Sequence, residues 1–108
     1  MLLLLTCFSV FGQTENTIPK DFEKIEGLEY TGEITFYLQK KTQTILAYQS
    51  GKVKWKEAVV KICGKPSVGK SEIRKIQIED KHLKIVYGKH SFARIEMETG
   101  KVVCEGED

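Results

Sequence analysis

The chain has 108 residues, of which 41% are hydrophobic and 30% charged, and its 17 basic and 15 acidic side chains give a formal net charge of only +2 at pH 7. This length fits one small domain with a core of limited extent, and we expect no second domain within these residues. The near balance of charges argues against nucleic-acid binding, which relies on a clear excess of Lys and Arg.

The first twelve residues, MLLLLTCFSVFG, carry no charge and are mostly apolar. Such a stretch is typical of the hydrophobic region of a secretory signal peptide, and it is too short to cross a bilayer as a helix. We expect cleavage near Gly12, which would release a secreted or periplasmic chain of 96 residues without a transmembrane segment. Two alternatives remain, a lipoprotein modified at Cys7 and a buried N-terminal strand of a cytosolic protein.

Residues 13–28 are expected to form a polar N-terminal tether. The stretch QTENTIPK is polar and contains Pro19, which disfavours regular structure. In the following DFEKIEGL, Phe22 and Ile25 stand at helical spacing before Gly27, which predicts a short helical turn.

Residues 29–108 are predicted to form a single all-β domain. Segments rich in β-branched and aromatic residues alternate with short polar connections such as KKTQ, SGK and ETG, as in consecutive antiparallel strands. The expected strands are EITFYLQ, TILAYQ, VKWKEAVVKIC, IRKIQIED, HLKIVYG, SFARIEM and KVVCEGE. We expect about seven to eight strands in two antiparallel sheets that pack face to face.

Between the two groups of strands, GKPSVGKS places Gly64, Gly69, Lys70 and Ser71 on every fixed position of the phosphate-binding pattern G-x-x-x-x-G-K-[ST]. A working phosphate loop leads into a helix whose N-terminus faces the anion. The residues that follow Ser71 alternate as in a strand instead, so we interpret the stretch as a Gly/Pro connector. Nucleotide binding at this loop is the alternative hypothesis.

The segments before and after this connector, about 29–63 and 72–106, resemble each other. TILAYQSGKVKW and SFARIEMETGKVVC share an Ala near the start and a Gly-Lys-Val turn exit, and Gly51 and Gly100 are 49 positions apart. The pattern Ala-x-x-x-x-[Thr/Ser]-Gly-Lys-x-x-Trp resembles the signature of PQQ-like (quinoprotein-type) β-propeller repeats. The first copy matches it from Ala47 to Trp55 with a shortened turn, and the second copy has Cys104 at the Trp position.

This resemblance implies two blade-like sheets, with tight turns at Gly51 and Gly100 and with Trp55 docked against the neighbouring blade. It does not imply quinone chemistry, because two blades cannot close a ring. The acidic residues that accompany the quinone and its calcium ion in that family also have no recognisable counterpart in this sequence. We therefore expect no cofactor and no metal site.

Cys63 and Cys104 are the two cysteines that remain after removal of the signal peptide. In an oxidising compartment an even pair predicts a disulfide. Two separate buried thiols are the alternative, because a sequence does not show whether the two Cα atoms come within bonding reach.

The sequence contains no convincing catalytic constellation. His82 and His90 fall at strand starts or turns, and nothing positions an acid behind His90 and the adjacent Ser91. Glu96 and Glu98 have the two-residue spacing of a solvated strand face. We therefore predict that the chain is not an enzyme.

Aromatic and basic residues provide the remaining indications of a ligand. Seven aromatic residues could offer a glycan-stacking surface, although a domain of this size needs most of them for its core. They are Tyr30, Phe36, Tyr37, Tyr48, Trp55, Tyr87 and Phe92. Residues 40–95 hold fourteen Lys or Arg against four acids, which suits either solvated strand faces or an anionic partner.

We therefore expect a secreted or periplasmic, non-catalytic binding or envelope-associated module. Its partner, an envelope protein or a glycan, is not identified by any motif, and no nucleic-acid partner is expected. Homo-oligomers formed through exposed edge strands are a further hypothesis.

Overall fold

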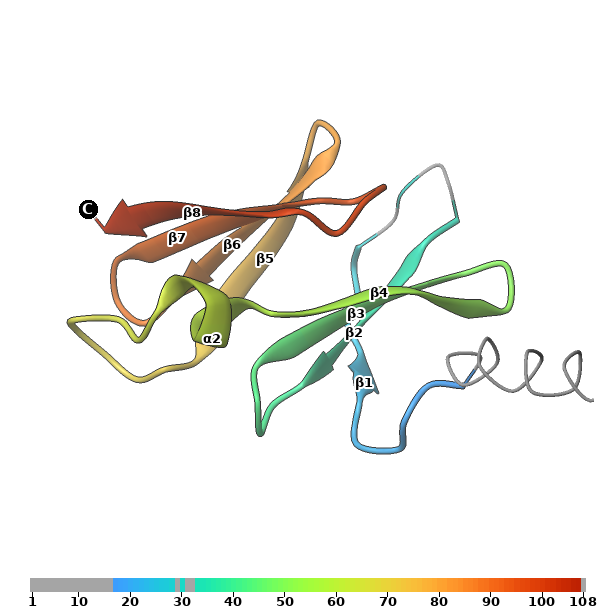
Figure 1. The fold of residues 1–108 in the computed structure, drawn as a ribbon, viewed down its shortest axis with the longest axis horizontal. Coiled ribbons are helices and arrows are strands. Elements are labelled where there is room, and N and C mark those ends of the chain that lie inside the picture. Colours follow the sequence, from blue (N-terminus) through green and yellow to red (C-terminus); the bar gives the residue numbers. More distant parts are fainter. Residues whose placement is uncertain (1–16, 29, 31–32, 108) are drawn as a thin grey trace, which may run out of the picture.

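The computed structural model describes residues 17–28, 30 and 33–107, and within these the chain folds into two four-stranded antiparallel sheets that do not close into a barrel (Figure 1). The first sheet contains β1 (Glu23–Lys24), β2 (Thr35–Gln39), β3 (Thr44–Gln49) and β4 (Lys52–Ala58). The second contains β5 (Ile73–Glu79), β6 (His82–Tyr87), β7 (Ser91–Glu96) and β8 (Val102–Glu107). Each sheet follows sequence order, and the predicted all-β class with two antiparallel sheets is confirmed.

The predicted signal peptide, the cleavage site near Gly12 and the lipidation alternative at Cys7 lie outside the described residues. Within the described part of the chain, no helix has the length and apolar character needed to cross a membrane.

Local sequence accounts for the hairpins. KKTQ joins β2 to β3, Asp80–Lys81 joins β5 to β6, and both connections fall where they were predicted. Between β3 and β4, Ser50 and Gly51 both adopt positive φ, 54° and 78°. Positive φ at both central residues suits a two-residue hairpin because its twist matches that of the flanking strands.

One predicted strand ends earlier than expected. VKWKEAVVKIC was predicted to be a single strand, but β4 ends at Ala58 and Val59–Cys63 forms the helical turn α2. Val59 and Val60 are 0% and 8% exposed. Two consecutive side chains of a strand point to opposite faces, whereas a helical turn can bury both while Lys61 remains in solvent. Burial of both valines is therefore the physical reason for the correction.

The helical turn predicted for DFEKIEGL is also wrong. Glu23 and Lys24 pair with Leu38 and Tyr37 as β1, and the Ile25 N–H continues the ladder by donating to the Phe36 carbonyl at 2.9 Å. Pairing with the edge of β2 satisfies these backbone groups while Ile25 packs against the core. The fourth strand of the first sheet thus comes from the segment that was expected to be a tether.

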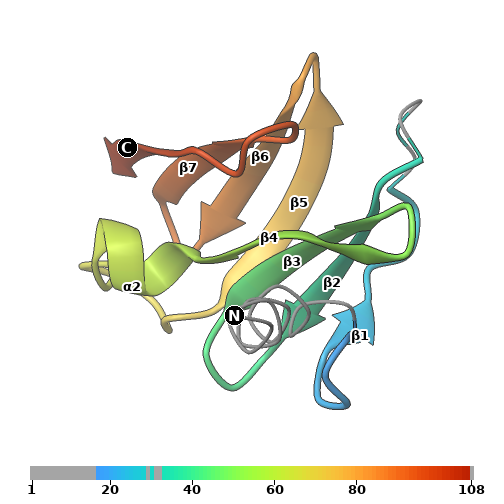
Figure 2. The same ribbon diagram turned by 45° about the vertical axis from the view of Figure 1, so that its right-hand side comes forward.

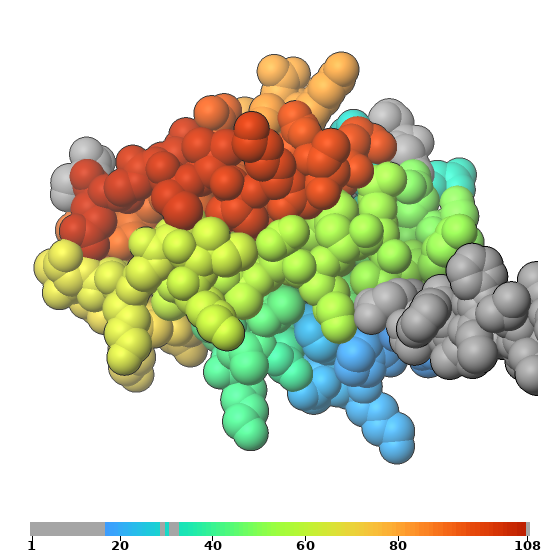
Figure 3. Space-filling view, viewed as in Figure 1, coloured from blue at the N-terminus to red at the C-terminus, as the bar shows by residue number. Residues whose placement is uncertain are grey.

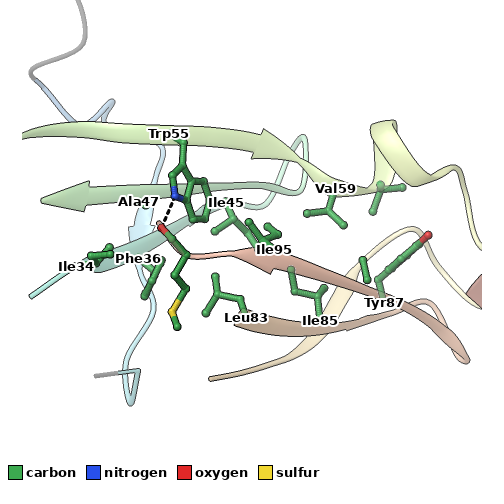
Figure 4. Close-up of a cluster of buried hydrophobic side chains, with 13 residues drawn as sticks. Ile34, Phe36, Ile45, Ala47, Trp55, Val59, Leu83, Ile85, Tyr87 and Ile95 are labelled. Atoms are coloured by element: carbon green, nitrogen blue, oxygen red, sulfur yellow. Dashed lines mark hydrogen bonds between the residues drawn. The ribbon is translucent and has the colours of Figure 1, made fainter. Parts of the chain in front are cut away.

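The core lies between the two sheets, where their inward faces meet (Figure 4). The inward residues alternate along each strand with outward ones, as the period of two requires. The buried core side chains are Ile34, Phe36, Ile45, Ala47, Trp55, Val59, Val60, Leu83, Ile85, Tyr87, Ala93, Ile95 and Met97. Both sheets contribute, so neither sheet has a separate core of its own.

Trp55 connects the two sheets directly. Its indole Nε1–H donates to the Met97 carbonyl oxygen at 2.8 Å, across the sheet interface (Figure 4). The ring also packs beside Phe36, with ring centroids 6.1 Å apart. A buried indole N–H needs such a partner. Trp55 of the first sheet is therefore docked on the end of β7 and the turn that follows it.

Gly100 lies directly under this indole. A Cβ added at Gly100 would be 2.6 Å from Trp55 Cγ, whereas a Cβ added at Gly51 would meet nothing within 4 Å. Both glycines have positive φ, 82° and 78°. The turn glycine of the second sheet is therefore required for space as well as for backbone conformation.

This contrast gives a matched prediction. We expect Gly51→Ala to lower the free energy of unfolding by about 1 kcal/mol, from backbone strain alone, and Gly100→Ala to lower it by about 2–4 kcal/mol because the overlap with Trp55 is added. Urea denaturation followed by far-UV circular dichroism measures both. Equal losses of unfolding free energy in the two variants would show that a methyl group at position 100 does not overlap with the Trp55 ring.

A disulfide joins Cys63 at the end of α2 to Cys104 in β8, with Cα atoms 5.5 Å apart. This confirms the predicted pair and excludes the alternative of two separate thiols. α2 contacts β8, and in Figures 1 and 2 it lies at the same end of the second sheet as the C-terminus, so the bond ties the connection between the sheets to the last strand. Cys104 itself is exposed.

Candidate functional site

The connector, residues 64–71, lies against the turn between β6 and β7. The Lys89 N–H donates to the Val68 carbonyl at 2.9 Å. A Cβ at Gly69 would be 2.7 Å from Lys89 N. Gly69 is therefore explained by close packing of two loops, which is a structural role.

The connector leads into a strand. β5 begins at Ile73, two residues after Ser71, as the alternating sequence predicted. Gly64, Gly69, Lys70 and Ser71 are all exposed. In the part of the chain that the structure describes, no helix starts at this loop, so the aligned N–H groups of a phosphate cradle are missing.

The anion that the connector does bind belongs to the chain itself. The Glu107 carboxylate accepts hydrogen bonds from the Ser67 backbone N–H and from Ser67 Oγ, each at 2.7 Å. Ser91 Oγ donates to the same carboxylate at 3.1 Å. These bonds, with the Ser67 N–H as the largest cause, hold the pKa of Glu107 below its ordinary value, and the charge of His90 contributes least. Glu107 thus anchors the end of β8 to the connector.

We expect the Glu107 bonds to make stability depend on pH. Because the folded pKa is lower than the unfolded one, the stabilisation is present above the unfolded pKa and is lost as the pH falls through the folded pKa. Glu107→Gln removes the charge, so the variant should lose less stability than the wild type between about pH 6 and pH 3. Its Ser67 amide should also exchange faster at neutral pH in hydrogen-exchange measurements. Identical pH profiles would contradict the assignment.

A groove on the first sheet is the more promising place for a ligand. It has a volume of about 500 Å³, which is within the range of small-molecule sites. It is lined by Pro19, Phe22, Gln39, Thr42, Thr44, Lys56, Ala58 and Lys61. In Figure 3 the blue and teal segments that flank it project at the lower edge of the molecule.

The strand register builds the floor of this groove. Gln39 pairs with Thr44, and Thr44 pairs with Ala58, so the three form one row across β2, β3 and β4. Ile45, the neighbour of Thr44, points into the core. The side chains of Gln39, Thr44 and Ala58 therefore point away from the second sheet, because successive side chains of a strand alternate between faces.

The chain before β1 forms the opposite wall. The Phe22 N–H donates to the Pro19 carbonyl at 3.1 Å, which closes a turn. Phe22 is half-buried. The pairing of β1 with β2 holds this turn over the end of the first sheet. An apolar wall therefore faces the polar floor.

A chain of hydrogen bonds, which we call the polar row, fixes the side chains of Gln39, Thr42 and Thr44. Gln39 Nε2 donates to the Asp21 carboxylate, and Thr42 Oγ1 donates to Gln39 Oε1. Thr42 Oγ1 and Thr44 Oγ1 are 2.7 Å apart. These bonds order the polar side chains before any ligand arrives, which lowers the entropic cost of binding.

Two basic side chains line the groove at the side of β4 and α2, and the Asp21 carboxylate lies beside Gln39 at the side of β2. The basic side chains are Lys56 and Lys61, and both are exposed. None of the described residues that line the groove is acidic. Lys40, in the adjacent turn, has its Nζ 3.9 Å from the Glu23 carboxylate, a separation at which an exposed ion pair is weak. An anionic group would therefore be attracted to the side of the groove that Lys61 lines, away from Asp21.

The other residues singled out from the sequence do not form a site. His82 is half-buried on β6 and His90 is exposed in a turn, and no cluster of three or more His, Cys, Asp or Glu that could hold a metal occurs among the described residues. Phe36, Trp55 and Tyr87 are buried in the core.

Two of the remaining aromatic residues lie on the outer face of the first sheet. Tyr37 and Tyr48 form an edge-to-face pair there, with ring centroids 6.5 Å apart. Tyr37 pairs with Leu46, which also lies opposite Lys56. The tyrosine pair and the groove therefore share one face of the first sheet.

Sequence reasoning missed the groove. KKTQ was interpreted only as a hairpin connection, Thr44 only as the start of a strand, and Phe22 only as part of a helical turn. A row of Thr and Gln side chains beside a basic pair was the available indication, but its partners Phe22 and Lys61 are distant in sequence.

Comparisons with protein-family models, with curated proteins and with solved structures found no match to this chain. The resemblance to PQQ-like propeller repeats therefore stays a prediction, and a function has to be inferred from the groove and its chemistry.

Proposed function

We propose that the protein is a non-catalytic binding module, secreted or held in the cell envelope, that takes its ligand in the groove on the first sheet. The observation that carries this proposal is the polar row, which is already ordered by hydrogen bonds on the floor of a groove of about 500 Å³. The signal-like N-terminus supports the extracellular or periplasmic location.

The residues that line the groove suit ligand binding better than catalysis. They offer hydroxyl and amide groups, two ammonium groups and one aromatic ring. General acid–base or nucleophilic catalysis needs an acid, a base or an activated nucleophile within hydrogen-bond reach of its partner. Among the described residues of the lining no such pair occurs. Binding without turnover is therefore the function that the groove supports.

A glycan is the better candidate than an envelope protein. A concave site with a few fixed polar groups and an aromatic wall suits a small ligand or one segment of a polymer. A stable protein interface usually needs a much larger contact area with a hydrophobic centre. We therefore place the ligand among envelope or extracellular polysaccharides.

The proposal is tested with a panel of envelope-type oligosaccharides against the purified, immobilised protein. We expect at least one member to bind, and we expect Ala58→Leu, which fills the floor of the groove, to weaken that binding by about tenfold or more. Val103→Leu, which also creates a leucine but at an exposed position of β8 in the second sheet, is the control and should bind normally. Absence of any binder, or undiminished binding by Ala58→Leu, would overturn the proposal.

A further inference from the structure

The polar row has a direction that follows from the chemistry of its ends. An ionised carboxylate only accepts hydrogen bonds, so the group that Gln39 presents to Asp21 is its NH₂. Its Oε1 consequently faces Thr42, and the Thr42 hydroxyl must donate to it. A hydroxyl has a single proton, so in the contact between the two threonines Thr44 donates to Thr42.

This direction leaves acceptors on the floor of the groove. The hydroxyl protons of Thr42 and Thr44 are both used within the row. A hydroxyl oxygen has two lone pairs, so Thr44 Oγ1 retains both of its lone pairs and Thr42 Oγ1 retains one. The row is therefore matched to ligand hydroxyl groups that donate, and it offers no hydroxyl proton to an anion.

The lysines of the groove provide what the two threonines of the polar row lack, namely hydrogen-bond donors for an anion and positive charge. Lys61 lies in the last turn of α2, and Lys56 lies on β4 on the same face as the row. The exposed ammonium group of Lys61 carries three donors and a full charge. An anionic group of a ligand would bind at this side, while its hydroxyl groups bind at the row.

Phe22 and Pro19 on the opposite wall provide an apolar surface for the ligand. An aromatic ring and a proline ring pack well against the C–H face of a pyranose, as aromatic side chains commonly do in amphipathic sites. A free phosphate or sulfate ion has no such face. The groove therefore combines an apolar wall, threonine oxygens that can accept hydrogen bonds from ligand hydroxyl groups, and a basic side at Lys61.

We propose that the groove selects acidic oligosaccharides, with Thr42 and Thr44 accepting hydrogen bonds from sugar hydroxyls and with Lys61 binding the sugar carboxylate. This inference rests on the function proposed above and names its substrate class. Binding should weaken with added salt because Lys61 is exposed.

Isothermal titration of the full chain with trigalacturonate, maltotriose and inorganic phosphate tests this inference. Trigalacturonate should bind, and maltotriose and phosphate should bind about tenfold more weakly or not at all. Lys61→Met keeps the apolar stem and removes the charge, and it should weaken trigalacturonate binding by about tenfold or more. Lys65→Met, at an exposed lysine of the connector, is the matched control and should bind as the wild type does.

A second variant separates the two parts of the site. Thr44→Val keeps the shape of the side chain and removes the accepting oxygen, so it should weaken trigalacturonate binding while leaving the fold intact. Equal binding of maltotriose and trigalacturonate, with no effect of Lys61→Met, would overturn the acid selectivity but leave the binding module standing. Phosphate binding as tight as trigalacturonate binding would overturn the choice of a saccharide. If no oligosaccharide of the wider panel binds either, both proposals fail.

Discussion

Replacing Trp55 with alanine is expected to lower the free energy of unfolding by about 3–5 kcal/mol, the range for truncation of a large buried aromatic side chain. Trp55 is only 7% exposed, and it packs against Phe36 in its own sheet and against Gly100 in the turn between β7 and β8. Its loss would leave a cavity at the interface and an unpaired carbonyl at Met97. A domain of this size has little stability to spare, so the variant should be largely unfolded at physiological temperature.

The measurement is urea denaturation by far-UV circular dichroism, because Trp55 is the chain's only tryptophan and fluorescence would be lost with it. Trp55→Phe keeps an aromatic ring and should lose less stability than alanine, which keeps the test informative if the alanine variant does not fold. Phe92→Ala, at a half-buried position of β7, is the control and should cost less than half as much. A Trp55→Ala variant within about 1 kcal/mol of the wild type would contradict the docking role of the indole.

Breaking the Cys63–Cys104 disulfide is the second change with a large expected effect. The bonded cysteines are 41 positions apart, and closing a loop of that length stabilises the folded state by about 4 kcal/mol in the chain-entropy model. The bond also ties α2 to β8, so its loss should loosen the connection between the sheets first. We expect the reduced protein to melt well below the oxidised one.

The double variant Cys63→Ser, Cys104→Ser isolates this effect from other actions of the reductant. Its Tm should be low and should not change when reductant is added, whereas the wild type should lose stability only in the presence of reductant. Scanning calorimetry with and without dithiothreitol gives both values. A wild-type Tm that is insensitive to complete reduction would show that the bond does not stabilise the fold.

The hairpins could be predicted from the sequence because their signals are local. A two-residue alternation of apolar residues and a short polar connection are enough to define strands such as β6 and β7. Val59–Cys63 could not be assigned in this way, since its helical form depends on burying two consecutive valines in the core between the sheets. The pairing of Glu23–Lys24 likewise depends on a free edge of β2, which no local pattern encodes.

The groove depends on tertiary structure in the same manner. Its walls come from the N-terminal turn, the β2–β3 hairpin, β4 and α2, which the fold brings together. GKPSVGKS, by contrast, has a strong local pattern, but the structure around it determines its role: Gly69 packs against Lys89, and Ser67 binds Glu107. A motif of this kind indicates a site only where the helix that it requires is present.

The formation of homo-oligomers through exposed edge strands stays a prediction, and the residues of the edge strands affect it. β4 carries Lys52, Lys54 and Lys56, and Lys54 Nζ lies 3.5 Å from the Glu98 carboxylate. Lysines along an edge strand discourage pairing with a second copy. Assembly through this edge is therefore disfavoured.

Chemical-shift mapping of the isotope-labelled protein during titration with trigalacturonate tests the central claim, that the groove on the first sheet is the ligand site. We predict that the shifts concentrate on the amides of Phe22, Gln39, Thr42, Thr44 and Lys61, and that the connector around Lys70 and the outer face of the second sheet stay unchanged. Shifts that concentrate on the connector, or that spread evenly over the exposed lysines, would contradict the claim.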